Sequence, residues 1–240
     1  MKIARSGTCL LIFLFFSTHM AGQDVRLGVI GGLMTGIEER LNDAPVDDIR
    51  PVGSIQLDFR MQVDERYPFY LGATLGWGER TILNDEISEQ VGNEQSDIGI
   101  ERDLRVIAFG IPAAVLLDLT PRLSVGALLE GGYARIRVTE AIAVADAGSN
   151  AFTQQLAGEA TGSAFYLVPE ATLVYEMDIP FFLNVSAGYR FMSSDMRWEP
   201  QANIGPVLSR FVSQGTSSFD FGGMYFSAGI HYILFGEEEF

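Results

Sequence analysis

Cysteine, lysine and histidine are nearly absent from this chain of 240 residues. The one cysteine is Cys9, the one lysine is Lys2, and the two histidines are His19 and His231. If the N-terminal segment is removed after export, His231 is left as the last histidine and no thiol remains. Disulfides and thiolate chemistry are then excluded. One histidine cannot build a transition-metal site, so we predict no metal ligands and no cofactor.

Long apolar runs are absent too, apart from one short run near the start. Residues 10–16 are apolar, follow the cations Lys2 and Arg5, and precede small residues at Ala21 and Gly22. This order is typical of a secretory signal peptide, and the run is shorter than the roughly 18 residues of a membrane-spanning helix. We expect residues 1–22 to be the signal peptide, with the cut within 21–23, and residues 23–240 to form a single domain.

Positive charge is scarce: 16 lysines and arginines face 31 acidic residues, a formal net charge of −15. Nucleic-acid binding needs a basic surface, so that class of partner is excluded. Many of the acids gather in residues 37–50 and 84–103. We expect them to keep a cell surface solvated and mutually repelling. Divalent-cation binding is the alternative, because Ca²⁺ takes clustered carboxylate oxygens, but neither segment has the spacing of a calcium motif.

What the chain does contain is period-two hydrophobicity. In residues 52–63, for example, Ile55, Leu57 and Phe59 alternate with Gln56 and Asp58. Eight such stretches occur, at 25–34, 52–63, 69–78, 104–117, 123–135, 165–175, 181–191 and 224–234. A strand that crosses a membrane turns every second side chain to the lipid, and its backbone polar groups must be satisfied in a closed barrel.

The gaps between these stretches alternate in length. Those at 64–68, 118–122 and 176–180 are short and contain proline and aspartate, the residues of tight turns. The others are much longer, and lie at 35–51, 79–103, 136–164 and 192–223. Short turns at one end and long loops at the other are typical of outer-membrane barrels. We therefore predict an all-β fold, an eight-stranded antiparallel up-and-down transmembrane β-barrel with short periplasmic turns and long extracellular loops.

Two of these stretches resemble a known family. Residues 104–112, which end on an Ile-Pro step, and residues 123–133, which end in Gly131-Gly132-Tyr133, resemble the middle of the outer-membrane β-barrel domain family of PorT-like and OmpX-like small outer-membrane proteins. Residues 187–191 and 229–232 are similar to the closing strands of that family. The resemblance implies a cell outer-membrane location. The chain departs from the family at its end, where residues 236–239 separate Phe235 from Phe240, so either Phe could be read by the barrel-assembly machinery.

The polar parity of each strand predicts which side chains point into the barrel. The inward charged residues form a predicted lumen charge network of Arg26, Asp58, Arg60, Glu130, Glu170, Arg190 and His231. Tyr70, Tyr166, Asn184 and Tyr225 are expected beside them. An eight-stranded barrel has room only for its own side chains. Buried charges must pair, so we expect a salt-bridged plug in which Arg60 meets Glu130 or Glu170. A gated path for protons or small ions through the same network is the alternative.

The sequence offers no catalytic set. Ser227 lies four residues before His231, which on a strand separates them by about 13 Å, too far for a nucleophile and its base. Trp77 and Trp198 are expected to anchor the barrel at the membrane interface, with Arg105 at the outer boundary. We predict no catalytic residues and a non-enzymatic outer-membrane barrel with a structural or surface-interaction role in the cell envelope. A narrow gated, porin-like channel is the first alternative and a lipid-modifying enzyme the second.

The expected partners follow from this reading. They are outer-membrane lipids, the barrel-assembly machinery during insertion and, through the long loops, other envelope proteins.

Overall fold

The computed structural model describes residues 24–35, 38–41, 44–46, 51–64, 67–91, 94–145, 152–200 and 213–235. The expected signal peptide and the C-terminal residues 236–240 lie outside them. The described strands are β1 (Val25–Met34), β2 (Glu38–Leu41), β3 (Ala44–Val46), β4 (Val52–Asp64), β5 (Tyr67–Val91), β6 (Glu94–Thr120), β7 (Leu123–Ala145), β8 (Phe152–Glu176), β9 (Phe181–Pro200), β10 (Thr216–Asp220) and β11 (Gly223–Phe235). None of the described residues forms a helix long and apolar enough to cross a membrane.

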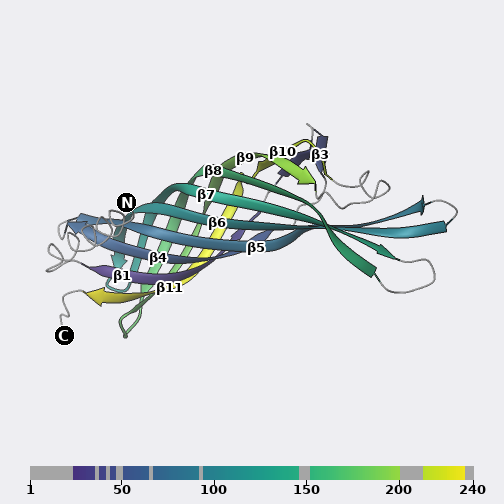
Figure 1. Cartoon of the computed structure of the whole chain (residues 1–240). Helices are drawn as coiled ribbons and strands as arrows, with labels where there is room; N and C mark the ends of the chain where they lie inside the picture. Colours follow the sequence, from purple (N-terminus) through teal and green to yellow (C-terminus); the bar gives the residue numbers. More distant parts are fainter. Residues whose placement is uncertain are drawn as a thin grey trace, which may run out of the picture.

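Eight of these strands close into a barrel. They follow the order β11-β1-β4-β5-β6-β7-β8-β9, and β11 also pairs with β9, which completes the ring. Every pairing is antiparallel, and Val25 at the start of β1 is opposite Phe235 at the end of β11. The predicted eight-stranded antiparallel barrel is confirmed (Figure 1). We call the end with the short turns the inner end and the opposite end the outer end.

An apolar band surrounds the inner part of the barrel. Alternate residues of β4 are exposed, and Ile55 and Leu57 have exposed fractions of 65% and 51%. Phe165 on β8 and Trp77 on β5 are exposed to 82% and 58%. Exposed ion pairs border the band at its outer edge. Arg105 lies 2.6 Å from Glu79, and Arg137 lies 2.6 Å from Glu159. We refer to this edge as the charged rim.

Beyond the charged rim the strands continue, which corrects two of the predicted loops. Residues 79–91 pair with 94–105 as parts of β5 and β6, and most of 136–164 belongs to β7 and β8. Figure 1 shows these two hairpins reaching beyond the rest of the barrel. The alternation of apolar and polar residues changes phase at the charged rim, because the apolar residues face outward below the rim and inward above it. On β6, Ile107 and Phe109 face outward below the rim, whereas Leu104 and Val106 face inward at and above it.

The segments predicted as loops at 35–51 and 192–223 also contain strands. β9 pairs with β11 through Phe181–Arg190 and changes partner to β10 through Ser193–Arg197. β10 pairs in turn with β2, and β2 with β3. Before β10 the backbone turns at Gly215, whose φ of 89° favours glycine. The Gly215 carbonyl accepts a hydrogen bond from the backbone N–H of Trp198 at 3.0 Å. Strands β10, β2 and β3 therefore form a second tier of wall beside the outer part of β9.

Candidate functional site

The lumen is the place where the sequence predicts function, and its inner mouth is organised around Arg26. The Arg26 guanidinium donates to Asp24 Oδ2 at 2.7 Å and to the Tyr70 hydroxyl at 3.0 Å. It also lies over the Phe182 ring at 4.0 Å from the ring centroid. Asp24 is the ion-pair partner of Arg26. A polar cavity of about 450 Å³ opens here, between Arg26, Asp118 and other residues of the inner mouth.

A triad of ionisable side chains lies deeper in the lumen, on β4 and β11, the two strands that flank β1. Arg60 Nη2 is 2.5 Å from Asp58 Oδ2 on β4, and His231 Nε2 on β11 is 3.3 Å from the same oxygen. Gly28 on the intervening β1 makes room for the imidazole, since a Cβ there would lie 2.3 Å from His231 Cδ2. Asp58 is fully buried, so Arg60 and His231 share one carboxylate that water does not reach. Within the described part of the chain, Asp58 Oδ1 and Arg60 Nε have no hydrogen-bond partner.

Glu130 is held by neutral donors. Its carboxylate accepts from the Tyr166 hydroxyl at 2.6 Å, the Gln56 amide at 2.9 Å and the Thr74 hydroxyl at 3.0 Å. Gly110 leaves space for this cluster, because a Cβ there would lie 2.5 Å from Glu130 Oε1. Several hydrogen bonds can satisfy a buried carboxylate without a cation. The expected pairing of Arg60 with Glu130 or Glu170 is not found among the ion pairs of the described residues, where the partner of Arg60 is Asp58.

Arg190 is placed among aromatic rings. Its guanidinium carbon lies 4.7 Å from the Tyr225 ring centroid and 5.5 Å from that of Tyr166, and Nη1 is 2.6 Å from Met34 Sδ. Such stacking stabilises a cation inside a barrel. Glu170 is buried with an exposed fraction of 8%. The seven residues of the predicted network thus share the lumen, and six of them fall into four groups: Arg26 at the mouth, the Asp58 triad, the Glu130 cluster, and Arg190 with its rings. Tyr166 joins the last two groups, and the seventh residue, Glu170, interacts electrostatically with Arg60 and Arg190.

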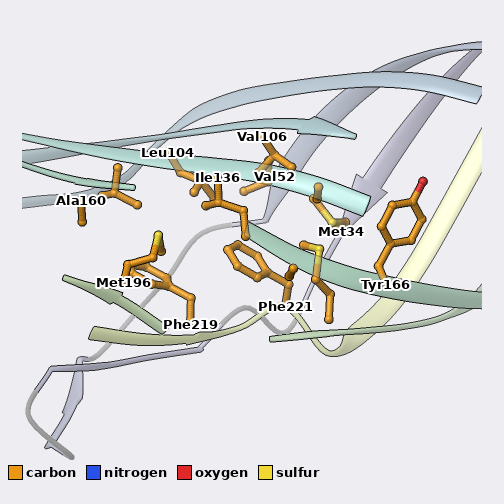
Figure 2. Packing of buried hydrophobic residues seen from close by; sticks show 14 of the residues in the cluster. Met34, Val52, Leu104, Val106, Ile136, Ala160, Tyr166, Met196, Phe219 and Phe221 are labelled. Carbon is orange, nitrogen blue, oxygen red and sulfur yellow. The ribbon is translucent and has the colours of Figure 1, made fainter. Parts of the chain in front are cut away.

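Around and above the charged rim the lumen is filled by apolar side chains, which the sequence did not predict. Figure 2 shows Phe219 and Phe221 beside Met196, Ile136 and Leu104 in the middle of this packing. Both phenylalanines are fully buried, and their rings stack with centroids 5.9 Å apart. We call this cluster the apolar plug; it consists of Met34, Val52, Leu104, Val106, Ala134, Ile136, Val138, Ala160, Ala164, Tyr166, Val168, Met192, Met196, Trp198, Phe219, Phe221 and Tyr225.

A polar clamp closes the top of the apolar plug. Glu140, fully buried, accepts from Arg102 Nε at 2.7 Å, from the Ser213 backbone N–H at 2.8 Å and from the Ser213 hydroxyl at 2.6 Å. Trp198 lies beneath the Arg102 guanidinium at 5.3 Å and donates its indole N–H to Ser217 Oγ at 2.7 Å. Trp198 is 3% exposed, so its predicted role as an interface anchor is wrong. Trp77 does lie on the outer surface, just below the charged rim.

This arrangement seals the lumen in two ways, by hydrogen-bonded charges below and by close apolar packing above. A packed cluster of this kind leaves little room for water or ions. The acid-rich residues 37–50 and 84–97 have side chains outside the described part, and the cation-binding alternative for them stays a prediction. Among the described side chains, no three histidine, cysteine or acidic residues gather as a metal site would need.

No protein-family model matches the chain, and no curated protein matches it in sequence. Solved structures do match. OprG, an outer membrane protein of Pseudomonas aeruginosa, aligns with a TM-score of 0.54 at 11% identity, covering 90% of this chain and 97% of that one. Neisserial surface protein A aligns with a TM-score of 0.43 at 9% identity, covering 88% and 99%. A major outer membrane protein of Thermus thermophilus aligns at 0.44 and 10%, covering 88% and 99%. The likeness to OprG shows a shared fold, that of a small outer-membrane β-barrel.

Proposed function

We propose that this protein is a non-enzymatic barrel of the outer membrane, exported by its N-terminal signal peptide, whose role is structural or surface-interacting. In this proposal it is a relative of the PorT-like and OmpX-like small outer-membrane proteins. The apolar band meets lipid, and the tall hairpins β5–β6 and β7–β8 stand outside the membrane, where they can contact other envelope proteins.

The observation that carries this proposal is the apolar plug. Transport would require a continuous polar path, and the outer half of the lumen is instead packed like the core of a water-soluble protein. Phe219, Phe221 and Met196 come from the chain that follows β9 and from β9 itself, so the plug is built from the wall and from the second tier together. A sealed barrel with a raised outer wall is suited to presenting a surface.

The position of His231 argues against catalysis on a lipid. Its imidazole is 3% exposed, points into the lumen and is engaged by Asp58. An enzyme that acts on a membrane lipid needs its base at a surface that the lipid can reach. Ser227 faces the same lumen and is also buried. Neither residue is accessible from the apolar band.

A planar-bilayer recording tests the proposed function against the channel alternative. We expect no conductance from the refolded wild-type barrel, and none from Glu130→Ala, because the apolar plug closes the lumen above Glu130 whatever occupies that position. Discrete conductance steps in the wild type would contradict the sealed barrel. Steps that appear only in Glu130→Ala would show that the Glu130 cluster, rather than the plug, blocks the path.

Single-cysteine labelling in cells tests the location and the orientation. The mature chain is predicted to contain no cysteine, so one introduced thiol reports one position. Thr139→Cys lies two residues beyond Arg137 on β7 and faces outward above the charged rim, and Asp178→Cys lies in the short turn between β8 and β9. A membrane-impermeant maleimide is expected to label Thr139→Cys on intact cells and Asp178→Cys only after the outer membrane is permeabilised. If only Asp178→Cys is labelled on intact cells, the barrel has the opposite orientation. If neither variant is labelled, the proposed exposure of the tall hairpins at the cell surface is wrong.

A further inference from the structure

A hollow lies on the outside of the barrel, within the apolar band. It is a groove of about 850 Å³ that crosses β9, β11, β1, β4 and β5. Its outward-facing lining is apolar apart from Glu79 at the upper end. Because this face is turned away from the lumen, the groove belongs to neither the charged groups nor the apolar plug.

The groove exists because small residues align on neighbouring strands. Gly31 is opposite Ala228 on one side, and Leu33, two residues further along β1, is opposite Gly53 on the other. Gly31, Gly53 and Ala228 form the floor together with Ala187. Larger side chains stand around them: Ile55 and Trp77, which are cross-strand partners, on one side and Val185 and Phe226 on the other.

The missing side chains leave true open space. A Cβ at Gly53 would meet nothing within 4 Å, and one at Gly31 would meet only the Ala228 carbonyl oxygen at 3.8 Å. The glycines are therefore not required by close backbone packing at these two places. Larger residues would fit the wall and fill the groove.

The upper end of the groove meets the charged rim. Glu79 lines it and forms the exposed ion pair with Arg105. The barrel wall is shorter on this side and ends at the same level, because β1 ends at Met34 and β4 begins at Val52. Above this point, the partner of β5 among the described strands is β6 alone. The groove thus runs from the apolar band to the level at which charged groups of a membrane begin.

We propose that this groove binds one acyl chain of an outer-leaflet membrane lipid. Below the charged rim it is continuous with the surface that the apolar band presents to lipid, so hydrocarbon must fill it if no protein does. A flexible chain can follow a floor of glycine and alanine, and each buried methylene adds favourable transfer free energy. The Glu79–Arg105 pair then lies beside the headgroup. This inference rests on the membrane placement proposed above.

A second copy of the chain fits the groove less well. Two identical subunits related by a two-fold axis present the same patch to each other. With the axis through the groove, the glycine floors would face one another across a void, and a void forfeits dispersion contacts. The lipid chain has no such symmetry constraint.

Trp77 supplies a direct reporter, because it lines the groove and Trp198 is the only other tryptophan. In Trp198→Phe, all indole fluorescence comes from the groove. Brominated phosphatidylcholine, titrated into this variant in detergent, is expected to quench Trp77 along a saturating curve. Quenching that rises linearly with lipid would mean non-specific contact and would overturn the groove as a site. No quenching at all would contradict the membrane placement itself.

Filling the groove separates its contribution from general lipid contact. Native mass spectrometry counts the phosphatidylcholine molecules that stay bound to the purified barrel. Gly53→Leu and Gly31→Leu are each expected to lower this occupancy by about tenfold, because about two methylenes of the acyl chain lose their contact. Gly131→Leu is the matched control, because Gly131 faces outward on β7, away from the groove. A Cβ placed there would have Leu167 Cδ1 as its nearest neighbour at 3.7 Å, an ordinary van der Waals distance. It is expected to retain lipid as the wild type does.

The remaining outcomes decide against the proposal. Equal lipid occupancy in the wild type and both groove variants would overturn it. A dimer mass that is lost in Gly53→Leu would assign the groove to a second copy instead. If neither groove variant shows the heat-shifted gel mobility of a folded barrel, the Trp77 titration decides alone.

Discussion

Replacing Asp58 by leucine is expected to destabilise the barrel by roughly 3–5 kcal/mol, the usual cost of removing one partner of a buried ion pair. Asp58 is fully buried, and its Oδ2 serves both Arg60 at 2.5 Å and His231 at 3.3 Å. The substitution leaves the Arg60 guanidinium in the lumen without its carboxylate. Urea unfolding of the refolded barrel in lipid vesicles measures the loss. Asp178→Leu, whose carboxylate is 76% exposed in a turn, is the control and is expected to leave the unfolding midpoint unchanged.

The double variant Asp58→Leu/Arg60→Leu tests the pairing itself. Because both desolvation penalties disappear together, we expect it to recover much of the stability that Asp58→Leu loses. Additive losses in the double variant would show that Arg60 is stabilised by another carboxylate, with Glu130 and Glu170 as the first candidates.

Truncating Phe221 to alanine is expected to cost about 3–5 kcal/mol, the range for large-to-small changes in a packed core. Phe221 is fully buried in the apolar plug, its ring stacks on Phe219, and its backbone N–H donates to the Met192 carbonyl at 2.8 Å. The side chain is lost but the backbone bond stays, so the cost arises from the cavity. Urea unfolding measures it.

Phe165→Ala is the matched control for this change. Phe165 is 82% exposed on the apolar band, where lipid can fill the space that the ring vacates, so we expect a much smaller loss of stability. The double variant Phe219→Ala/Phe221→Ala is further expected to conduct ions in a planar bilayer, because it removes the centre of the seal. A silent double variant with intact folding would show that the clamp of Arg102 and Glu140, or the hydrogen-bonded charges below the plug, close the lumen without the two rings.

The sequence alone determined the barrel within the apolar band. Short turns at 118–122 and 176–180 and the alternation in β1 and β4 follow from local rules, since lipid on one face and a narrow polar lumen on the other leave a strand no other pattern. The inward placement of Asp58, Glu130 and His231 follows from the same alternation, because parity cannot change along a regular strand.

Only the tertiary structure decided what happens beyond the charged rim. In the proposed membrane placement, water replaces lipid there on the outer face, so the apolar residues lie on the inner face while the strand continues unbroken. On β7, Tyr133 faces out below this boundary, whereas Val138 and Ile142 face in above it. Along the sequence, this shift of phase looks like the end of a strand and the start of a loop, and it hid the buried position of Trp198.

The sequence likewise did not determine which side chains pair with one another inside the lumen. Parity places Arg60 in the interior but does not choose among the carboxylates there, because that choice depends on cross-strand register and on space. The imidazole of His231 reaches Asp58 only because Gly28 stands between them. The outer groove exists only because Gly31 comes into register with Ala228 and because Gly53, opposite Leu33, leaves open space on the neighbouring strand. Local pattern sets which face a side chain takes, whereas register between distant strands sets what it touches.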